Sequence, residues 1–245
     1  MKPPPLEGAP STRIEENAAS EHGSVVSYPT RCPQWGSAKF RGNCDGRLFL
    51  SLVQRYRPRR VADPMLGSGT TRDVIASWNL QRAEADRIDY WGSDLSEGFN
   101  LEEQDLPGAF DFVWVHPPYW NIIQFSNDLR DLSTEPDYST FIRRLEQCLS
   151  ACVRSLAPAG RLAVLVGDVR RRGLYYPIIR DVLNMEPRLG QLRSVIVKVQ
   201  HNCTSDGRSY RLEDARIQHE YCIVFKRAQA GRMGTSRGRV EGRRA

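Results

Sequence analysis

The stretch Val61-Ala62-Asp63-Pro64-Met65-Leu66-Gly67-Ser68-Gly69-Thr70-Thr71 decides the fold of this 245-residue chain. It begins as a short apolar run, passes through Asp63-Pro64 and two glycines, and continues into a helix-like segment. This order predicts a strand, a tight loop and a helix. A Gly-x-Gly turn lets a ligand approach the backbone closely, and the N–H groups that begin the helix favour carboxylates and other anionic groups.

The glycine loop departs from two common nucleotide-binding motifs. A dinucleotide fingerprint needs a third glycine where this chain has Arg72, and a Walker A loop needs Gly-Lys-Ser/Thr, which is absent. The loop alone also fits an ordinary strand-to-helix connection, so its interpretation depends on a second motif. That motif is His116-Pro117-Pro118-Tyr119, which follows the apolar strand Phe112–Val115.

Together the two motifs resemble those of the amino-group DNA methyltransferases, which use S-adenosylmethionine. The first matches the family's Asp-Pro-Phe-x-Gly-Ser-Gly-Thr-Thr loop with Met65 in place of Phe. The second matches Asp/Asn/Ser-Pro-Pro-Tyr, with His116 in the variable first place. The similarity extends from about Phe40 to Lys226. It implies an α/β, Rossmann-like class I methyltransferase fold: a seven-stranded, mostly parallel sheet with helices on both faces and a terminal antiparallel hairpin.

Length and composition predict one soluble domain. A chain of 245 residues with 40% hydrophobic content can bury one sizeable core. No segment approaches about 18 consecutive apolar residues, and the N-terminus lacks an apolar signal core, so we expect a cytoplasmic protein with no membrane partner. The six cysteines form no Cys-x-x-Cys pair, and no histidine pair has zinc spacing, so we expect neither a metal site nor a disulfide framework.

Charge and composition divide the chain into three parts. Residues 226–245 hold seven basic residues and one acid, which accounts for the whole formal net charge of +6. We expect a disordered segment at 1–30, a methyltransferase domain at 31–226 and a disordered basic tail at 227–245. Because the rest of the chain is neutral overall, a DNA-binding face on the domain must be a local patch.

Apolar periodicity places the remaining elements. Helices are expected at about 48–53, 70–78, 138–156 and 177–185, and strands at 61–63, 90–93, 111–115, 161–166, 192–200 and 221–225. The third strand of the fold is not visible between residues 96 and 110. Residues 192–200 and 221–225 are the predicted terminal hairpin.

The cofactor-binding residues that the resemblance implies are spread over three segments. The candidates are Phe40, Asn43, Asp63, Pro64, Gly67, Ser68, Gly69, Thr70 and Asp94. Phe40 and Asn43 lie in the segment that contacts the methionine end of the cofactor in the family, although an ordinary loop is an equal alternative. Asp94 ends the second strand, where a carboxylate binds ribose hydroxyls in Rossmann-like folds, and a helix N-cap is its alternative role. Phe99 and Asn100 are candidates for bordering the adenine.

Three segments are candidates for contact with nucleic acid. The long connection 120–136 begins at Trp120 and is expected to cover the target base. Arg170, Arg171 and Arg172 follow the strand 161–166 at the edge where the catalytic loop is expected, and they are either phosphate contacts or a solvated turn. The polar segment 201–218 is the one short candidate for sequence recognition.

The resemblance assigns the methyl transfer to His116, Pro117, Pro118 and Tyr119. In the family, the first motif residue and the next backbone carbonyl accept hydrogen bonds from the target amine, and the tyrosine stacks on a flipped base. Two consecutive prolines hold the loop extended. A neutral imidazole has one acceptor nitrogen, so activity should fail as the pH drops through the histidine pKa, about 6.5 if unperturbed. A nonfunctional substitution is the alternative for His116.

The resulting hypothesis is a site-specific DNA methyltransferase that acts on the exocyclic amine of adenine (N6) or cytosine (N4), as in restriction-modification systems. S-adenosylmethionine is the expected cofactor and DNA the expected partner, while a partner nuclease and the oligomeric state are not predicted. Histidine does not indicate which base is the target. The alternatives are an RNA guanine-N2 methyltransferase, a protein-glutamine methyltransferase, whose motif is usually Asn-Pro-Pro-Tyr, and a catalytically silent nucleic-acid-binding relative.

Overall fold

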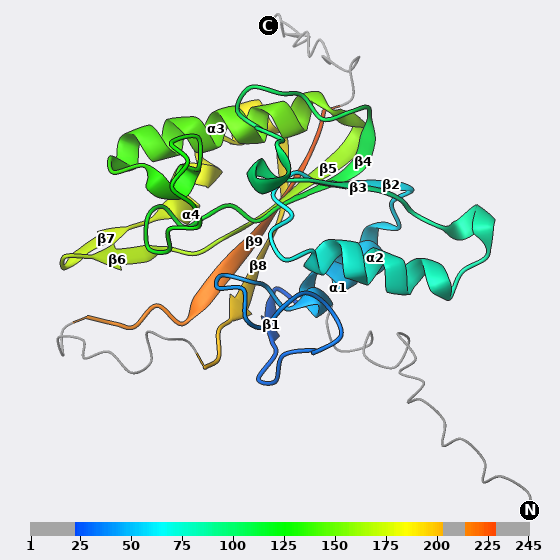
Figure 1. Cartoon of the computed structure of the whole chain (residues 1–245), viewed down its shortest axis with the longest axis horizontal. Helices are drawn as coiled ribbons and strands as arrows, with labels where there is room; N and C mark the ends of the chain where they lie inside the picture. The colour runs from blue at the N-terminus through cyan, green and yellow to red at the C-terminus, as the bar shows by residue number, and fades with distance from the viewer. Residues whose placement is uncertain (1–22, 203–213, 229–245) are drawn as a thin grey trace, which may run out of the picture.

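The computed structural model describes residues 23–202 and 214–228, and a central β-sheet dominates it (Figure 1). The strands are β1 (Val25–Ser27), β2 (Arg60–Asp63), β3 (Asp89–Gly92), β4 (Phe110–Val115), β5 (Leu156–Val166), β6 (Val169–Arg171), β7 (Leu174–Tyr176), β8 (Gln191–Val199) and β9 (His219–Lys226). The α-helices are α1 (Gly46–Tyr56), α2 (Thr70–Leu80), α3 (Tyr138–Arg154), α4 (Ile178–Leu183) and α5 (Glu186–Leu189). Short 3-10 turns are η2 (Glu84–Asp86), η3 (Leu95–Glu97) and η4 (Leu132–Thr134).

Seven of the described strands form one sheet in the order β1-β8-β9-β5-β4-β2-β3, and β6 and β7 form a separate two-stranded hairpin. Strand β9 runs antiparallel to β5 and β8, and the other pairs in the sheet are parallel. The predicted seven-stranded, mostly parallel sheet is therefore confirmed. The predicted antiparallel hairpin of β8 and β9 is also present, but β1 covers its outer edge.

Two cores form because side chains alternate across each strand. In β4, Phe112 and Trp114 belong to the core that contains α1 and α2, whereas Val113 and Val115 belong to the core that contains α3 and α4. Figure 1 shows α3 and α4 on one face of the sheet and α1 and α2 on the other. This two-sided covering explains why β4 and the C-terminal half of β5 are almost continuously apolar.

The structure corrects two expectations at the sheet edges. Residues 25–27, within the segment predicted to be disordered, form β1, whose Val26 is buried and pairs in register with Lys198 of β8. Two valines and a serine suffice to form this strand because the edge of β8 supplies hydrogen-bond partners. The composition averaged over residues 1–30 hides so short a segment. Residues 1–22 and most of the predicted tail lie outside the described residues. At the other edge, residues 96–109 contain no strand, so β3 ends the sheet.

Two further differences concern element boundaries. The helix predicted at 177–185 is followed by a separate turn of helix, α5, which has Pro187 in its first turn, where a missing N–H costs nothing. The arginine turn predicted after β5 is the hairpin of β6 and β7. No helix in the described ranges has the length and apolar character needed to cross a bilayer.

Candidate active site

A cavity of about 980 Å³ lies at the carboxyl ends of β2, β3, β4 and β5. Open α/β sheets bind ligands at this edge, and the volume is at the upper end of the roughly 300–1,000 Å³ usual for ligand sites. The predicted cofactor residues that line it are Phe40, Asn43, Asp63, Pro64, Gly67, Ser68, Thr70 and Asp94. His116, Pro117, Pro118 and Tyr119 also line it. Both sequence motifs therefore share one cavity.

The glycine loop between β2 and α2 is held by the buried side chain of Asp63. One carboxylate oxygen accepts from the Met65 amide at 3.1 Å, and the other accepts from the Thr71 hydroxyl. Burial raises the pKa of Asp63 to about 7, although these two donors oppose the shift. Asp63 thus shapes the loop from beneath.

The glycines of this loop have backbone conformations that other residues rarely adopt. Gly67 has φ 52° and Gly69 has φ 80°, both in the left-handed region. A Cβ atom on Gly67 would lie 3.3 Å from the ring of Phe40, so a side chain there would narrow the space beside that ring. Gly69 does not line the cavity, and it serves instead as the N-cap of α2, without a side-chain hydrogen bond.

Asp94 caps a short helical turn and also contacts the glycine loop. Its Oδ1 accepts from the amides of Ser96 and Glu97, so the side chain caps η3. Its Oδ2 accepts from the Gly67 amide at 2.9 Å and therefore ties the end of β3 to the glycine loop. The carboxylate lines the cavity. The N-cap is observed, and ribose binding stays a prediction.

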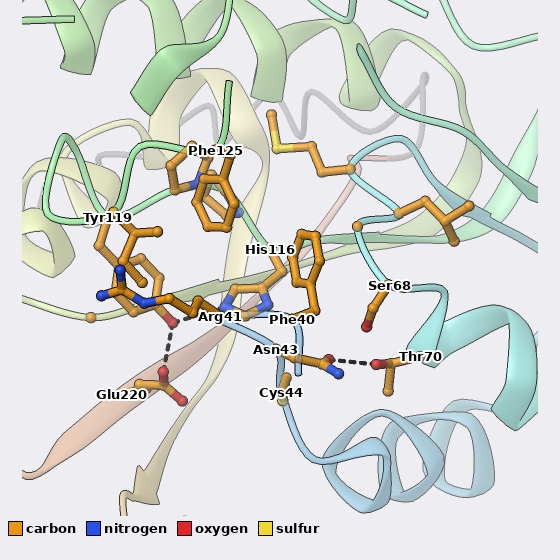
Figure 2. A pocket seen from close by; sticks show the side chains of 18 of the residues that line it. Phe40, Arg41, Asn43, Cys44, Ser68, Thr70, His116, Tyr119, Phe125 and Glu220 are labelled. Atoms are coloured by element: carbon orange, nitrogen blue, oxygen red, sulfur yellow. Dashed lines mark hydrogen bonds between the residues drawn. The ribbon is translucent and has the colours of Figure 1, made fainter. Parts of the chain in front are cut away.

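The segment before α1 packs directly on the glycine loop. The Thr70 hydroxyl donates to Asn43 Oδ1 at 2.5 Å, as Figure 2 shows, and Asn43 Nδ2 donates to the Ser37 carbonyl. A Cβ atom on Gly36, whose φ is 65°, would lie 2.1 Å from the Thr70 hydroxyl oxygen. Only glycine permits this approach, which places Phe40 and Asn43 on the cavity wall.

The catalytic loop after β4 is fixed through the hydroxyl of Tyr119. This hydroxyl donates to Glu220 Oε1 at 2.9 Å and lies 3.0 Å from His116 Nε2 (Figure 2). The Tyr119 ring rests against Gly167, where a Cβ atom would come within 2.8 Å of a ring carbon. The loop therefore depends on β9 and on the residue that follows β5.

Glu220 is the centre of a buried polar group that sequence reasoning missed. Lys198 Nζ donates to its Oε2 at 2.6 Å, and Gln200 Nε2 donates to its Oε1 at 2.7 Å. Burial opposes ionisation of Glu220, but Lys198, His116 and the hydrogen bonds from Lys198 and Tyr119 outweigh it and hold its pKa below the ordinary value. Glu220 is therefore a carboxylate.

Burial strongly affects the ionisation of His116. Desolvation lowers its pKa to about 4, with Glu220 opposing and Lys198 adding to the effect. At neutral pH the ring is therefore neutral and can accept a hydrogen bond. The pH at which activity is expected to fail moves from about 6.5, the unperturbed value, down toward this lower value.

The residues predicted to bind nucleic acid lie mostly away from the cavity. Trp120 is only 5% exposed, packs against Tyr138 and Tyr176, and donates from Nε1 to the Glu135 carbonyl at 2.9 Å. Its large apolar ring is thus part of the core, which corrects its assignment as a base contact. The loop that it begins instead presents Phe125 to the cavity.

The three consecutive arginines have different surroundings. Arg170 forms a 2.7 Å ion pair with Asp214 and lines the cavity. Arg171 lies over the Trp120 ring at 5.0 Å and donates to Asn121. Arg172 is exposed at the tip of the β6–β7 hairpin. Arg171 therefore supports the loop, and Arg172 is the arginine of the three that faces solvent.

Two aromatic rings meet at the cavity from separate loops. The rings of Phe40 and Phe125 are stacked, with centroids 5.6 Å apart and an interplanar angle of 18°. Figure 2 shows them, with the Arg41 side chain crossing near Tyr119. Phe125 and Arg41 carry no motif that marks them in the sequence. Lys198 and Glu220 do carry a signal, since Lys198 is a lone charge in an apolar run and Glu220 is a charge at the start of another. The structure places the two opposite each other in register.

Comparisons with known proteins find methyltransferases among the solved structures. No family model matches the sequence, and no curated protein matches it. A candidate DNA modification methylase from Thermus thermophilus, solved with S-adenosyl-L-methionine, is 20% identical over 73% of this chain and 59% of that chain, with a TM-score of 0.37. TrmN from Thermus thermophilus is 17% identical over 76% of this chain and 50% of that chain, with a TM-score of 0.43.

An S-adenosylmethionine-dependent methyltransferase from Clostridium acetobutylicum ATCC 824 is 9% identical over 75% of this chain and 90% of that chain, with a TM-score of 0.45. The present chain thus spans somewhat over half of the methylase structure and half of TrmN.

Within the part of the chain that the structure describes, no group of three or more His, Cys, Asp or Glu side chains is arranged to hold a metal ion.

Proposed function

We propose that this protein is an S-adenosylmethionine-dependent methyltransferase that acts on the exocyclic amine of adenine (N6) or cytosine (N4) in DNA. The observation that carries the proposal is that one cavity joins the glycine loop to a half-buried, neutral His116 at the head of Pro-Pro-Tyr. A cofactor loop and an acceptor for an amine are the two parts that such a reaction requires.

The residues of the cavity fit the cofactor. Gly67 gives close access to the backbone, and the uncapped start of α2 directs N–H groups toward the loop. Asp94 offers a carboxylate to the ribose hydroxyls if it releases the Gly67 amide, while Phe40 and Asn43 would border the methionine end. When bound, S-adenosylmethionine supplies a methyl group on a positively charged sulfur.

His116 and the following prolines would position the target nitrogen. An exocyclic amine is a weak nucleophile because its lone pair is delocalised into the ring, and acceptors on its N–H groups draw it toward tetrahedral geometry. His116 supplies one acceptor, and the Pro117 carbonyl supplies a second. The bound cofactor would supply its methyl carbon to the nitrogen with loss of the bond to sulfur, and His116 would accept the proton that the nitrogen loses and release it to solvent.

Orientation accounts for most of the expected rate enhancement, because the methyl group is already activated. The low pKa of His116 suits an acceptor better than a proton store: at pH 7 a base with a pKa of about 4 is almost wholly unprotonated. Tyr119, held by Glu220, presents its ring as one wall for the base.

The test is incubation of the full chain with isotopically labelled S-adenosylmethionine and either DNA or RNA, followed by mass spectrometry of the nucleosides. Labelled N6-methyladenosine or N4-methylcytidine as the deoxynucleoside supports the proposal. Label in guanosine from RNA replaces it with the RNA alternative, and cofactor binding without label in either polymer rejects methyl transfer to nucleic acid. His116→Ala is the matched negative control.

A further inference from the structure

A charged pair lies buried under the catalytic loop, where two neighbouring strands bring it together. Lys198 of β8 and Glu220 of β9 are directly opposite each other in register, and their side chains are 12% and 9% exposed. Burying such a pair costs desolvation energy that its attraction offsets only with good geometry. A pair of this kind within the sheet therefore points to a role beyond stability.

The hydrogen bonds to Glu220 determine what it can do. Its Oε1 accepts from Tyr119 and Gln200, and its Oε2 accepts from Lys198. A carboxylate held by three donors has no proton to give, so Tyr119 must be the donor in the Tyr119–Glu220 hydrogen bond.

The direction of the Tyr119–Glu220 hydrogen bond also determines the direction of the one between Tyr119 and His116. A phenol has one proton, and Tyr119 donates it to Glu220. The Tyr119 oxygen can therefore only accept from His116 Nε2, which lies 3.0 Å away. Because a neutral imidazole carries one proton, Nε2 bears it and Nδ1 carries the lone pair. In Figure 2, the His116 ring lies between Tyr119 on one side and Phe40 and Asn43 on the other.

We propose that Glu220 is a positioning residue that acts through Tyr119 to hold His116 as the Nε2–H tautomer, so that Nδ1 is the acceptor for the target amine. The tautomer follows from the hydrogen bonds together with the neutral state of the ring, and only its use in methyl transfer rests on the proposed function. With the opposite tautomer, Nδ1–H would face the N–H groups of the amine, and two donors would meet.

The groups that face His116 come from three elements. Tyr119 belongs to the same loop, Glu220 to β9 and Lys198 to β8. The thiol of Cys44, beside the start of α1, is also near this charged pair, and burial raises its pKa to about 12, so it is neutral. Glu220 is therefore the group that can set the direction of the hydrogen bonds.

The isosteric variant Glu220→Gln offers a sharp test, because glutamine has one oxygen and one NH₂ group. With its oxygen directed at the Lys198 ammonium, the amide donates to Tyr119 and, once the Gln200 side chain turns its own amide oxygen inward, to Gln200 as well. Tyr119 then donates to His116 Nε2. The tautomer of His116 is thus expected to reverse without any loss of side-chain volume. Glu146→Gln is the matched control, since Glu146 pairs with Arg188 and does not line the cavity.

The measurement is long-range ¹H–¹⁵N NMR of the histidine rings in the ¹⁵N-labelled full chain at pH 7. The chain has four histidines, and the signal lost in His116→Asn identifies the ring of interest. We expect Nε2–H in the wild type and in Glu146→Gln, and Nδ1–H in Glu220→Gln. Nδ1–H in the wild type, or an unchanged tautomer in Glu220→Gln, would overturn the inference.

A second variant decides the matter if Glu220→Gln does not fold. Tyr119→Phe keeps the ring and removes the oxygen that accepts from Nε2, so both tautomers should become populated. A pure Nε2–H form in Tyr119→Phe would contradict the inference. These results need no activity, so a wild type with the expected tautomer that methylates nothing would reject the proposed function alone. If methylation is found, Glu220→Gln should lower kcat at least tenfold and leave cofactor affinity unchanged.

Discussion

The glycine loop and the catalytic loop lie at the same edge of the sheet, but they are held in different ways. The glycine loop is held by residues that are close in sequence: Asp63 binds Met65 and Thr71, two and eight residues away, and Asn43 and Asp94 bind it from 27 residues away. The catalytic loop depends on distant parts of the chain, because Tyr119 binds a residue 101 positions away. One loop is held by contacts that are short-range in sequence, and the other is supported by β8 and β9.

This difference predicts that binding and chemistry can be damaged separately. Changes in the glycine loop should weaken cofactor binding, and changes in the supports of the catalytic loop should lower turnover. Four variants or conditions, ordered from the largest expected effect to the smallest, would either sharpen that division or remove it.

The first variant is His116→Ala, which removes the acceptor at the head of the catalytic loop. We expect turnover to fall by about a hundredfold or more, in line with the roughly 10²–10⁴-fold typical of a positioned acid or base. Cofactor affinity, measured by calorimetry, should not change. His116→Asn keeps an acceptor and should recover part of the rate. Wild-type turnover in the alanine variant would reject the assignment, whereas an inactive Asn variant would question only the geometry.

The second variant, Gly167→Ala, tests the support of Tyr119 without touching a polar group. The added Cβ atom would lie 2.8 Å from the Tyr119 ring, so the ring must move. A displacement of about 1 Å can cost on the order of a hundredfold, and we expect a loss of turnover between about tenfold and that value. Gly23→Ala is the control, since its nearest contact would be 3.7 Å. Equal loss of rate and of cofactor affinity would argue against separate supports.

The third variant, Asp94→Ala, tests the glycine-loop side of the comparison. Two hydrogen bonds from ribose to a carboxylate are worth about 1.5–3 kcal/mol each, so affinity for S-adenosylmethionine should fall at least about tenfold. Asp94→Asn keeps an acceptor for the cap of η3 and should lose less. Asp105→Ala, an exposed acid paired with Arg154, is the control. Calorimetry that finds equal affinity in Asp94→Ala would refute the ribose assignment.

The smallest effect concerns stability and pH, and the two loops should act in opposite directions. The pKa of His116 is lowered to about 4, so the unfolded chain binds a proton first and stability is lost as the pH falls from about 6.5 toward 4. The pKa of Asp63 is raised to about 7, so the folded chain holds this proton more tightly than the unfolded chain does. The stabilisation that Asp63 adds to the free energy of unfolding is therefore lost as the pH rises from about 3.8 to 7.

Denaturant unfolding of the wild type and His116→Asn at pH 7 and about pH 4.5 separates these contributions. The variant should lose about 1–3 kcal/mol less than the wild type on acidification, since one pKa unit corresponds to about 1.4 kcal/mol. Asp63→Asn should lose more unfolding free energy than the wild type on the same acidification, because it lacks the group whose protonation stabilises the folded chain at low pH. Parallel curves for all three proteins would show that neither group is shifted as described.

The same contrast explains what the sequence could predict. The glycine loop is encoded by neighbours, so Asp63, Gly67 and the start of α2 follow from local pattern. The hydrogen bond from Tyr119 to Glu220 requires knowledge of which strands pair, and no local spacing supplies it. The prediction for Trp120 is wrong for the same reason, because an aromatic residue in a loop has the same local signal whether it faces ligand or core.

The reliance of Tyr119 on Glu220 also sets an order of events during synthesis. Thr71 and Glu220 are separated by about 150 residues, which a ribosome adds in roughly 7 to 30 seconds at about 5–20 residues per second. During that time the nascent chain already has the residues of the glycine loop but lacks the strand that supports the catalytic loop. The capacity to hold a cofactor should therefore arise before the capacity to use it.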